Sequence, residues 1–384
     1  MPLSPDSRIA FFYFVSAMSV GAVNGFAGLW LHSRGMTAGQ IGVIFAVPII
    51  GIVLAGVPVG RLADRARDWR HVIVGGALIS AVVPFGLLVV DDFAGLLVVW
   101  TLAVVTQVAI IPVVDAAALR RSRREGRDFG ILYAWKTVGY LTTVLATGFL
   151  VRAFSITAFL PAYLGLSLLR GLFALPLPPF RAAPSTEPRS QMLWVRSANS
   201  SALLPLIGWA LVHCTHSILN GFLGVLWIGR GVTPVMVGAL IAFSGVVETG
   251  VFVAFKTLIR RFKPTTLILI SCLAGVVRWC GFALAPPLEV LFVLQVLHGL
   301  TYAVGFMACT NLIADLAAED VAAEAQSFFS ILQSGVSVAA LVGFGALAGA
   351  FGAQAFFGCA LLAGLGALLV GFVMPRGTGA GGNE

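Results

Sequence analysis

Residues 24–42 read NGFAGLWLHSRGMTAGQIG, and residues 220–238 read NGFLGVLWIGRGVTPVMVG. At a constant offset of 196, both stretches have Asn, Gly, Phe, Gly, Arg, Gly, Thr and Gly at identical positions. The offset is about half of the 384-residue chain. The repeat therefore predicts two halves of similar structure.

Composition indicates that both halves lie in a membrane. The chain is 59% hydrophobic and 10% charged, with a mean hydropathy of +0.99, whereas soluble domains carry roughly 25% charged residues. Twelve apolar stretches each have about the 20 residues that a helix needs to cross the hydrocarbon layer, and they lack the alternation of barrel strands. We predict an all-α membrane protein with twelve transmembrane helices, at residues 9–31, 41–60, 72–90, 95–118, 129–151, 157–176, 202–228, 235–256, 265–285, 289–315, 327–349 and 352–374.

The distribution of basic residues predicts the topology. If the N-terminus is cytoplasmic, 18 of the 24 Lys and Arg residues fall in cytoplasmic segments, and the outer loops contain only Arg34, Arg152 and Arg230. Cytoplasmic loops carry such an excess. We expect a multi-pass protein of a bacterial-type inner membrane with both termini cytoplasmic. The net charge of +8 then reflects topology and not binding to nucleic acid.

A stretch rich in Pro, Ser and Arg separates the halves. We predict a six-helix bundle at residues 1–176, a cytoplasmic linker at 177–201 and a second six-helix bundle at 202–384. Six is an even number, so the two bundles have the same orientation in the membrane. Parallel repeats with a substrate site at their interface are a transporter architecture.

Other function classes lack their signatures. No ATP-binding loop, HExxH or Gly-x-Ser-x-Gly motif is present, so we expect neither an enzyme nor a cofactor. The five cysteines lie inside apolar stretches without CxxC spacing, which favours packed thiols over a disulfide or a metal site. A non-transporting sensor or scaffold is a remote alternative, because the loops are short. We expect a functional monomer.

The loop after the second apolar stretch has a known pattern. Residues 60–70 read GRLADRARDWR, which resembles the G-x-L-A-D-R-x-G-R motif of the major facilitator superfamily, although the later Gly is replaced. The resemblance implies the fold of that superfamily. It also implies a gating role for Asp64 and Arg65, whose charges can form bonds across the cytoplasmic mouth.

Further motifs resemble one branch of that superfamily, the phenylpropionate permeases, which are related to the lactose/proton symporters. They are VVDAAAL, DFGILYAWKTVGYL, GVVE, GVVRW and LQVLHGLTYAV, and the most specific points are Glu248, Arg278, Trp279 and His298. In sugar relatives, similar positions carry a substrate-binding Glu, an Arg and a His involved in coupling. Thr301 stands where those relatives have a further carboxylate.

The depth of residues in the bilayer independently indicates candidate functional residues in the second half. Counted along the helices, Glu248, Arg278, His298 and His216 lie in the middle third of the bilayer, where ionisable groups are costly and usually functional. Their repeat mates are apolar, namely Ile52, Val82, Leu102 and Val20. We expect proton coupling by Glu248 and His298, and substrate binding by Arg278, Trp279 and His216. A structural ion pair and hydrogen bonds between helices are the alternatives.

The first half offers mainly neutral polar groups at mid-depth. Asn24, Gln107 and Tyr140, with Asn220 from the repeat, are candidate substrate-binding residues, and helix–helix hydrogen bonding is the alternative for the two Asn residues. Asp115 and Lys136 lie toward the cytoplasmic side. We expect them to pair as an inner gate, and the alternative is a snorkelling Lys136 beside a solvated Asp115.

The sequence thus predicts a secondary transporter that couples protons to a small organic solute by alternating access. The resemblance implies an aromatic carboxylate such as a phenylpropionate, with proton-coupled sugar or nucleoside transport as the alternative. Its partners would be the solute, protons and the lipid bilayer.

Overall fold

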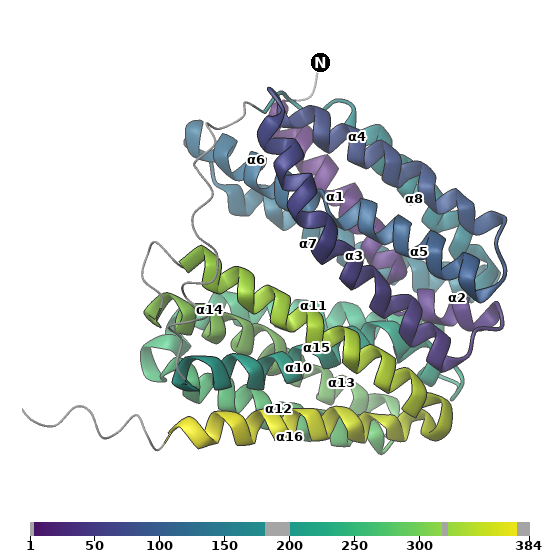
Figure 1. The fold of residues 1–384 in the computed structure, drawn as a ribbon. Helices are drawn as coiled ribbons and strands as arrows, with labels where there is room; N and C mark the ends of the chain where they lie inside the picture. The colour runs from purple at the N-terminus through teal and green to yellow at the C-terminus, as the bar shows by residue number, and fades with distance from the viewer. Residues whose placement is uncertain (1–3, 181–199, 317–321, 375–384) are drawn as a thin grey trace, which may run out of the picture. The chain divides into compact units, whose positions relative to one another are not determined.

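The computed structural model describes residues 4–180, 200–316 and 322–374, and every regular element in these ranges is a helix (Figure 1). In order, the elements are α1 (Pro5–Val23), α2 (Ala27–Ser33), α3 (Ala38–Arg65), α4 (Trp69–Val82), η1 (Val83–Leu88), α5 (Phe93–Val108), α6 (Ile111–Arg124), α7 (Phe129–Phe154), η2 (Ile156–Ala158), α8 (Phe159–Ala174), α10 (Ser200–Ile228), α11 (Pro234–Arg261), α12 (Pro264–Ala283), α13 (Leu288–His298), η3 (Gly299–Val304), α14 (Gly305–Leu316), α15 (Ala322–Phe351), η4 (Gly352–Ala355) and α16 (Phe356–Val373).

Each predicted span corresponds to a helix or a run of adjoining helices. In the described ranges, ten stretches are long and apolar enough to cross a membrane, or eleven if α1 and α2, bent by 45°, form one span. One of the ten, Ala325–Val373, is 49 residues long and covers the last two predicted spans, because the short η4 joins α15 to α16.

The outer faces of these helices are apolar. Val253 on α11, Leu54 on α3 and Leu368 on α16 are 82%, 71% and 71% exposed, and many other large apolar side chains are exposed in the same way. A water-soluble protein does not present so much contiguous apolar surface. The exposed side chains are therefore the lipid-facing surface that the composition predicted.

Contacts divide the chain into two units. Unit 1 comprises Met1–Glu187 and Gly221–Ala242, and unit 2 comprises Pro188–Asn220 and Phe243–Glu384. In unit 1, α1 packs along α7 and α4 packs along α8; in unit 2, α12 packs along α16 (Figure 1). Of the second copy of the repeat, Gly221–Gly238 belong to unit 1 and Asn220 to unit 2.

Glycines set the close approach of α1 to α7. A Cβ at Gly21 would lie 2.5 Å from the carbonyl oxygen of Tyr140, and one at Gly139 would collide with the carbonyl of Phe14. Without hydrophobic attraction between helices in lipid, association depends on close packing, which small residues allow. The two glycines therefore fix this pair.

Both copies of the repeat end a helix with the same turn. Gly35 and Gly231 have φ of 82° and 87°, a left-handed conformation that favours glycine. In each copy the residue after this glycine donates to a carbonyl five residues back, which closes a Schellman turn. The bonds join Met36 N to Leu31 O (3.1 Å) and Val232 N to Trp227 O (3.1 Å).

The duplicated threonines begin the next helices. Thr37 Oγ1 accepts from Gln40 N, and Thr233 Oγ1 accepts from Met236 N, both at 3.3 Å. Side-chain oxygens at this position satisfy the free N–H groups of a helix start. The repeat therefore encodes the same helix–turn–helix unit twice.

Within unit 1, the two copies also contact each other reciprocally. A Cβ at Gly28 would collide with the carbonyl of Gly221, and a Cβ at Gly224 would collide with the carbonyl of Gly25. Because Gly28 matches Gly224 and Gly25 matches Gly221 in the repeat, the two contacts are equivalent. Duplicated glycines are needed for both.

We predict that Gly28→Ala and Gly224→Ala each destabilise the protein by about 1–3 kcal/mol, because the added methyl group meets backbone that cannot rotate away. The measurement is the apparent Tm in detergent. Gly75→Ala on α4, where no atom lies within 4 Å of the added Cβ, is the control and should leave Tm unchanged or raise it slightly. Equal shifts in all three variants would contradict the proposed contact.

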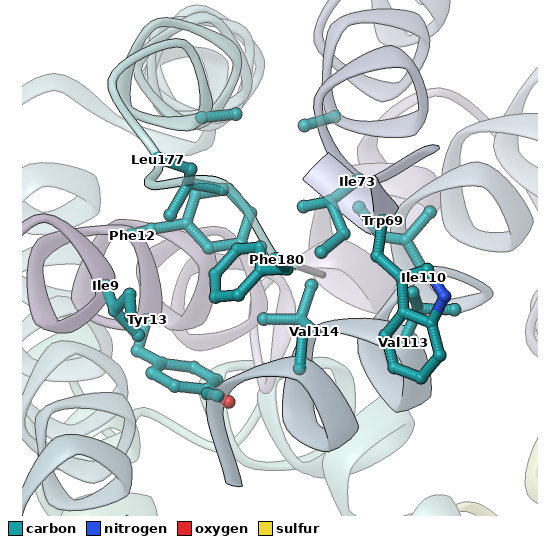
Figure 2. Packing of buried hydrophobic residues seen from close by; sticks show 14 of the residues in the cluster. Ile9, Phe12, Tyr13, Trp69, Ile73, Ile110, Val113, Val114, Leu177 and Phe180 are labelled. Carbon is teal, nitrogen blue, oxygen red and sulfur yellow. The ribbon is translucent and has the colours of Figure 1, made fainter. Parts of the chain in front are cut away.

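An apolar cluster in unit 1 joins the start of the predicted linker to the helices. Figure 2 shows Leu177 and Phe180 beside Phe12, Ile73 and Val114, and all five side chains are buried. The linker therefore begins as part of the core of unit 1.

Asp68 ties this segment to the loop between α3 and α4. Its Oδ1 accepts from Phe180 N and from Arg70 N, both at 2.8 Å, while Trp69 N donates to Phe180 O at 3.1 Å. Arg70 Nη2 also donates to Leu175 O at 2.8 Å. One carboxylate thus caps α4 and holds a segment 112 residues away.

Asp68→Ala should cost about 1–3 kcal/mol, since two backbone N–H groups lose their acceptor. Asp64→Ala is the matched control, because the Asp64 side chain is exposed and makes no hydrogen bond within the described ranges; its effect should stay within about 0.5 kcal/mol. Thermal unfolding of both variants measures this. A larger loss for Asp64→Ala would show that the loop is held differently.

Candidate functional site

A fully buried arginine lies at the centre of the site in unit 2. Arg278 on α12 has 0% exposure, and both terminal nitrogens of its guanidinium are engaged. Nη1 lies 3.0 Å from Thr301 Oγ1 and 3.2 Å from His216 Nε2, while Nη2 lies 2.6 Å from Gln295 Oε1 and 3.2 Å from His298 Nδ1. These partners come from α10, α13 and η3, so the cation joins three helical segments to its own.

The hydrogen-bonded chain continues from Arg278 to an acid. Nε2 of His298 lies 3.2 Å from Oε2 of Glu248 on α11. The side chains become more accessible along the chain, since that of His298 is 13% exposed and that of Glu248 is 26% exposed. Arg278 is thus linked to Glu248 by hydrogen bonds through His298, and no direct ion pair between Arg278 and Glu248 occurs among the described residues.

A π-helical turn, η3, follows His298 directly. Such a turn contains an extra residue and often occurs at functional sites. The carbonyl of Thr301 in this turn accepts from Trp209 Nε1 and Ser271 Oγ, both at 3.1 Å. A Cβ at Gly305 would collide with Trp209, so the glycine leaves room for this bond.

Aromatic rings enclose the polar groups. Tyr302 stacks on His298 with ring centroids 5.6 Å apart, and the guanidinium of Arg278 lies 4.6 Å from the ring centre of Trp279. Trp279 is fully buried and stacks on Phe356 at 5.5 Å. Its ring therefore packs beside the cation inside unit 2.

The predicted residues of the first half are partly brought together. Asn24 Nδ2 donates to the hydroxyl of Tyr140 at 3.0 Å, which joins the end of α1 to α7. Gln107 is buried on α5. Asn220, the repeat mate of Asn24, is half-buried and makes no side-chain hydrogen bond with the described part of the chain.

Asp115 and Lys136 do lie together, as expected, inside unit 1. Their charged atoms are 3.8 Å apart, and Asp115 also accepts from the hydroxyl of Tyr13 at 2.8 Å. Lys136 Nζ donates to Tyr133 at 3.1 Å. Asp64 and Arg65 are exposed and have no ion pair in the ranges that the structure covers.

Two residues of the site were missed by sequence reasoning. Gln295 is fully buried and has the shortest bond to Arg278, and Thr301 was noted only as the replacement of a carboxylate. Gln295 stands three residues before His298, so helical spacing places both on one face. A search of that face for polar residues would have found it.

A model described as the MFS_1 like family matches residues 7–359. The chain belongs to this family. MFS denotes the major facilitator superfamily, whose fold was predicted. The family and the relatives below are membrane transporters and not enzymes, so this member is a multi-pass membrane transporter for a small molecule.

Relatives of this family member have different named solutes. It is 28% identical to a probable 3-phenylpropionic acid transporter of Escherichia coli (strain K12), over 90% of this chain and 91% of that protein. It is 25% identical to a maltose permease of Geobacillus stearothermophilus, over 85% and 83%. A crystal structure of nucleoside transporter NupG has the same fold, with a TM-score of 0.83 at 16% identity over 98% of this chain and 100% of that one.

We predict that Arg278→Lys destabilises this MFS protein by about 3 kcal/mol or more. A single ammonium group cannot reach all the acceptors that the two terminal guanidinium nitrogens reach, and each hydrogen bond to a charged group contributes about 1.5–3 kcal/mol. Arg170→Lys is the control. Arg170 is equally buried but makes one described bond, from Nη2 to Ser80 O at 2.8 Å, which lysine can replace. Apparent Tm values compare them. Equal losses would mean that the four bonds of Arg278 add nothing.

Proposed function

We propose that this transporter is a proton-coupled symporter that imports a small organic solute by alternating access, with an aromatic carboxylate of the phenylpropionate type as the solute. The observation that carries the proposal is the hydrogen-bonded chain from Arg278 through His298 to Glu248. It connects a buried cation to a partly accessible carboxylate that can gain or lose a proton.

Proton coupling requires an acid that equilibrates with the transport pathway. Glu248, whose side chain is 26% exposed and bonds to His298, is the proposed acid. Polar groups at mid-membrane depth are costly and are retained chiefly for function. We therefore propose Glu248 and His298 as the coupling pair.

The choice of solute rests on the relatives. The probable 3-phenylpropionic acid transporter is 28% identical over nearly the whole chain, which favours an aromatic carboxylate. A maltose permease and the nucleoside transporter NupG support the second candidate, a neutral hydroxylated solute. Asn24, Tyr140 and Gln107 are the proposed solute contacts, since their neutral side chains orient either class.

Topology and gating complete the proposal. The distribution of Lys and Arg supports a bacterial-type inner membrane with both termini cytoplasmic, and the protein would act as a monomer. The Asp115–Lys136 pair, with a spacing of 3.8 Å, is the proposed inner gate. Asp64 and Arg65 are proposed to engage in a different conformation from the one described here.

The test is uptake by proteoliposomes of the full chain, with an imposed proton gradient and a panel of phenylpropionate, maltose and uridine. We expect gradient-driven accumulation of phenylpropionate that a protonophore abolishes. Glu248→Gln should reduce accumulation to the equilibrium level and leave downhill exchange measurable, because the amide cannot titrate. Glu289→Gln, an exposed acid at the start of α13, is the matched control and should accumulate normally.

The outcomes separate the parts of the proposal. Accumulation that survives the protonophore would overturn proton coupling. Accumulation of maltose or uridine in place of phenylpropionate would overturn the solute class alone. Full accumulation by folded Glu248→Gln would remove Glu248 from coupling.

A further inference from the structure

We propose that Arg278 is a positioning residue that holds His298 and His216 as neutral imidazoles of opposite tautomer, so that the proton taken up at this site goes to the Glu248 carboxylate alone. This deepens the proposed function and rests on it for the coupling step. The hydrogen positions follow from the contacts themselves.

The contacts of His298 assign its proton from two sides. A guanidinium has only donors, so Nδ1 of His298, 3.2 Å from Arg278 Nη2, must offer its lone pair. The single proton of the neutral ring is then on Nε2, which lies 3.2 Å from Oε2 of Glu248. An ionised carboxylate only accepts, so this second contact requires the same tautomer.

The contacts of His216 assign the opposite tautomer. Its Nε2 lies 3.2 Å from Arg278 Nη1, which only donates, and 3.0 Å from Thr301 Oγ1, a hydroxyl that can donate or accept. Its Nδ1 lies 3.2 Å from the carbonyl of Val212 and 3.3 Å from that of His213, and carbonyls only accept. The proton is therefore on Nδ1. One arginine thus faces the unprotonated nitrogen of both rings.

This arrangement disfavours a proton on His298. A second proton on Nδ1 would face a donor of Arg278, break that bond and place two cations 3.2 Å apart. Glu248 has no such penalty, because a carboxylic acid keeps one oxygen that accepts from His298 Nε2 while the other oxygen carries the proton. The network therefore stays intact in both protonation states of Glu248.

The surrounding titratable groups do not change this conclusion. Besides Glu248 and Arg278, His298 faces His216 of α10 and Tyr302 of η3. The ring centroids lie 5.1 Å and 5.6 Å from that of His298. The thiol of Cys359 on α16 is buried. The charges in this group are those of Arg278 and Glu248, so protonation of Glu248 leaves the site with one net positive charge, which attracts an anionic solute.

The direct test is nitrogen NMR of the full chain labelled on its histidine side chains, with signals assigned through His298→Gln, His216→Gln and His213→Gln. We expect His298 to carry a proton on Nε2 only and His216 on Nδ1 only, at every pH at which the protein stays folded. A doubly protonated His298, or a proton on its Nδ1, would overturn the proposal. This measurement does not depend on any transport activity.

Removal of the positioning residue gives a second measurement. In Arg278→Met, Nδ1 of His298 loses its donor, so this ring should take up a second proton as the pH falls, as an ordinary histidine does. Arg170→Met is the matched control and should leave both histidine signals unchanged. A His298 ring that still refuses a second proton in folded Arg278→Met would show that Arg278 is not what keeps it neutral.

A transport measurement distinguishes whether His298 carries the transported proton or only donates a hydrogen bond to Glu248. His298→Gln cannot titrate, but its amide can still donate to Glu248. We expect uptake to be roughly tenfold slower, which is the effect of losing one hydrogen bond to a charged group. The accumulation ratio should be retained. Lost accumulation with normal exchange in His298→Gln would assign the proton to His298. If the wild-type protein shows no proton-driven accumulation, the proposed function fails while the tautomer result still stands or falls on the NMR data.

Discussion

A guanidinium cation with no exposed surface lies inside unit 2, and the arrangement of the helices around it follows from its need for hydrogen-bond acceptors. Transfer of such a charge into an apolar interior costs several kcal/mol unless nearly every donor is satisfied. Here His216, Gln295, His298 and Thr301 supply acceptors, and the rings of Trp279 and Phe282 add cation–π contacts at 4.6 and 5.8 Å. Helices α10, α12, α13 and η3 therefore cannot rotate independently without leaving that charge unsatisfied.

The internal repeat duplicates geometry but not chemistry. The turns at Gly35 and Gly231 and the helix starts at Thr37 and Thr233 are the same in both copies. By contrast, the positions that match Arg278 and Glu248 are the apolar Val82 and Ile52. The duplicated frame thus serves folding in both halves, while the network around Arg278 has no copy in the first half.

Hydropathy and depth predicted the architecture well because lipid requires long apolar helices and makes each buried ionisable residue conspicuous. The same reasoning selected Glu248, Arg278, His216 and His298, which do lie together. It did not predict their bonding order, because a helix that is apolar on all sides gives no signal for its rotation. A direct ion pair between Arg278 and Glu248 was one expectation, and His298 lies between them instead.

The role of Asp68 was missed for a different physical reason. Its partner is the backbone N–H of Phe180, which is far away in the chain and has no side-chain signature. The motif directed attention to Asp64, which is exposed. Contacts between a side chain and distant backbone are hidden from pattern reasoning, whereas local caps such as Thr37 are visible in it.

The π-helical turn at Gly299–Val304 has a consequence for how this protein can change over evolution. Each residue of an α-helix advances the chain by about 100° around the axis, so one residue inserted into a regular α-helix rotates every side chain after it. A π-helical turn is wider and takes up such a residue locally, so the helices on both sides keep the faces that they present to their neighbours. A one-residue deletion that turned Gly299–Val304 into regular α-helix would therefore leave the packing face of α14 in place and change the backbone around Thr301. The same deletion in the middle of a regular helix would shift every contact beyond it.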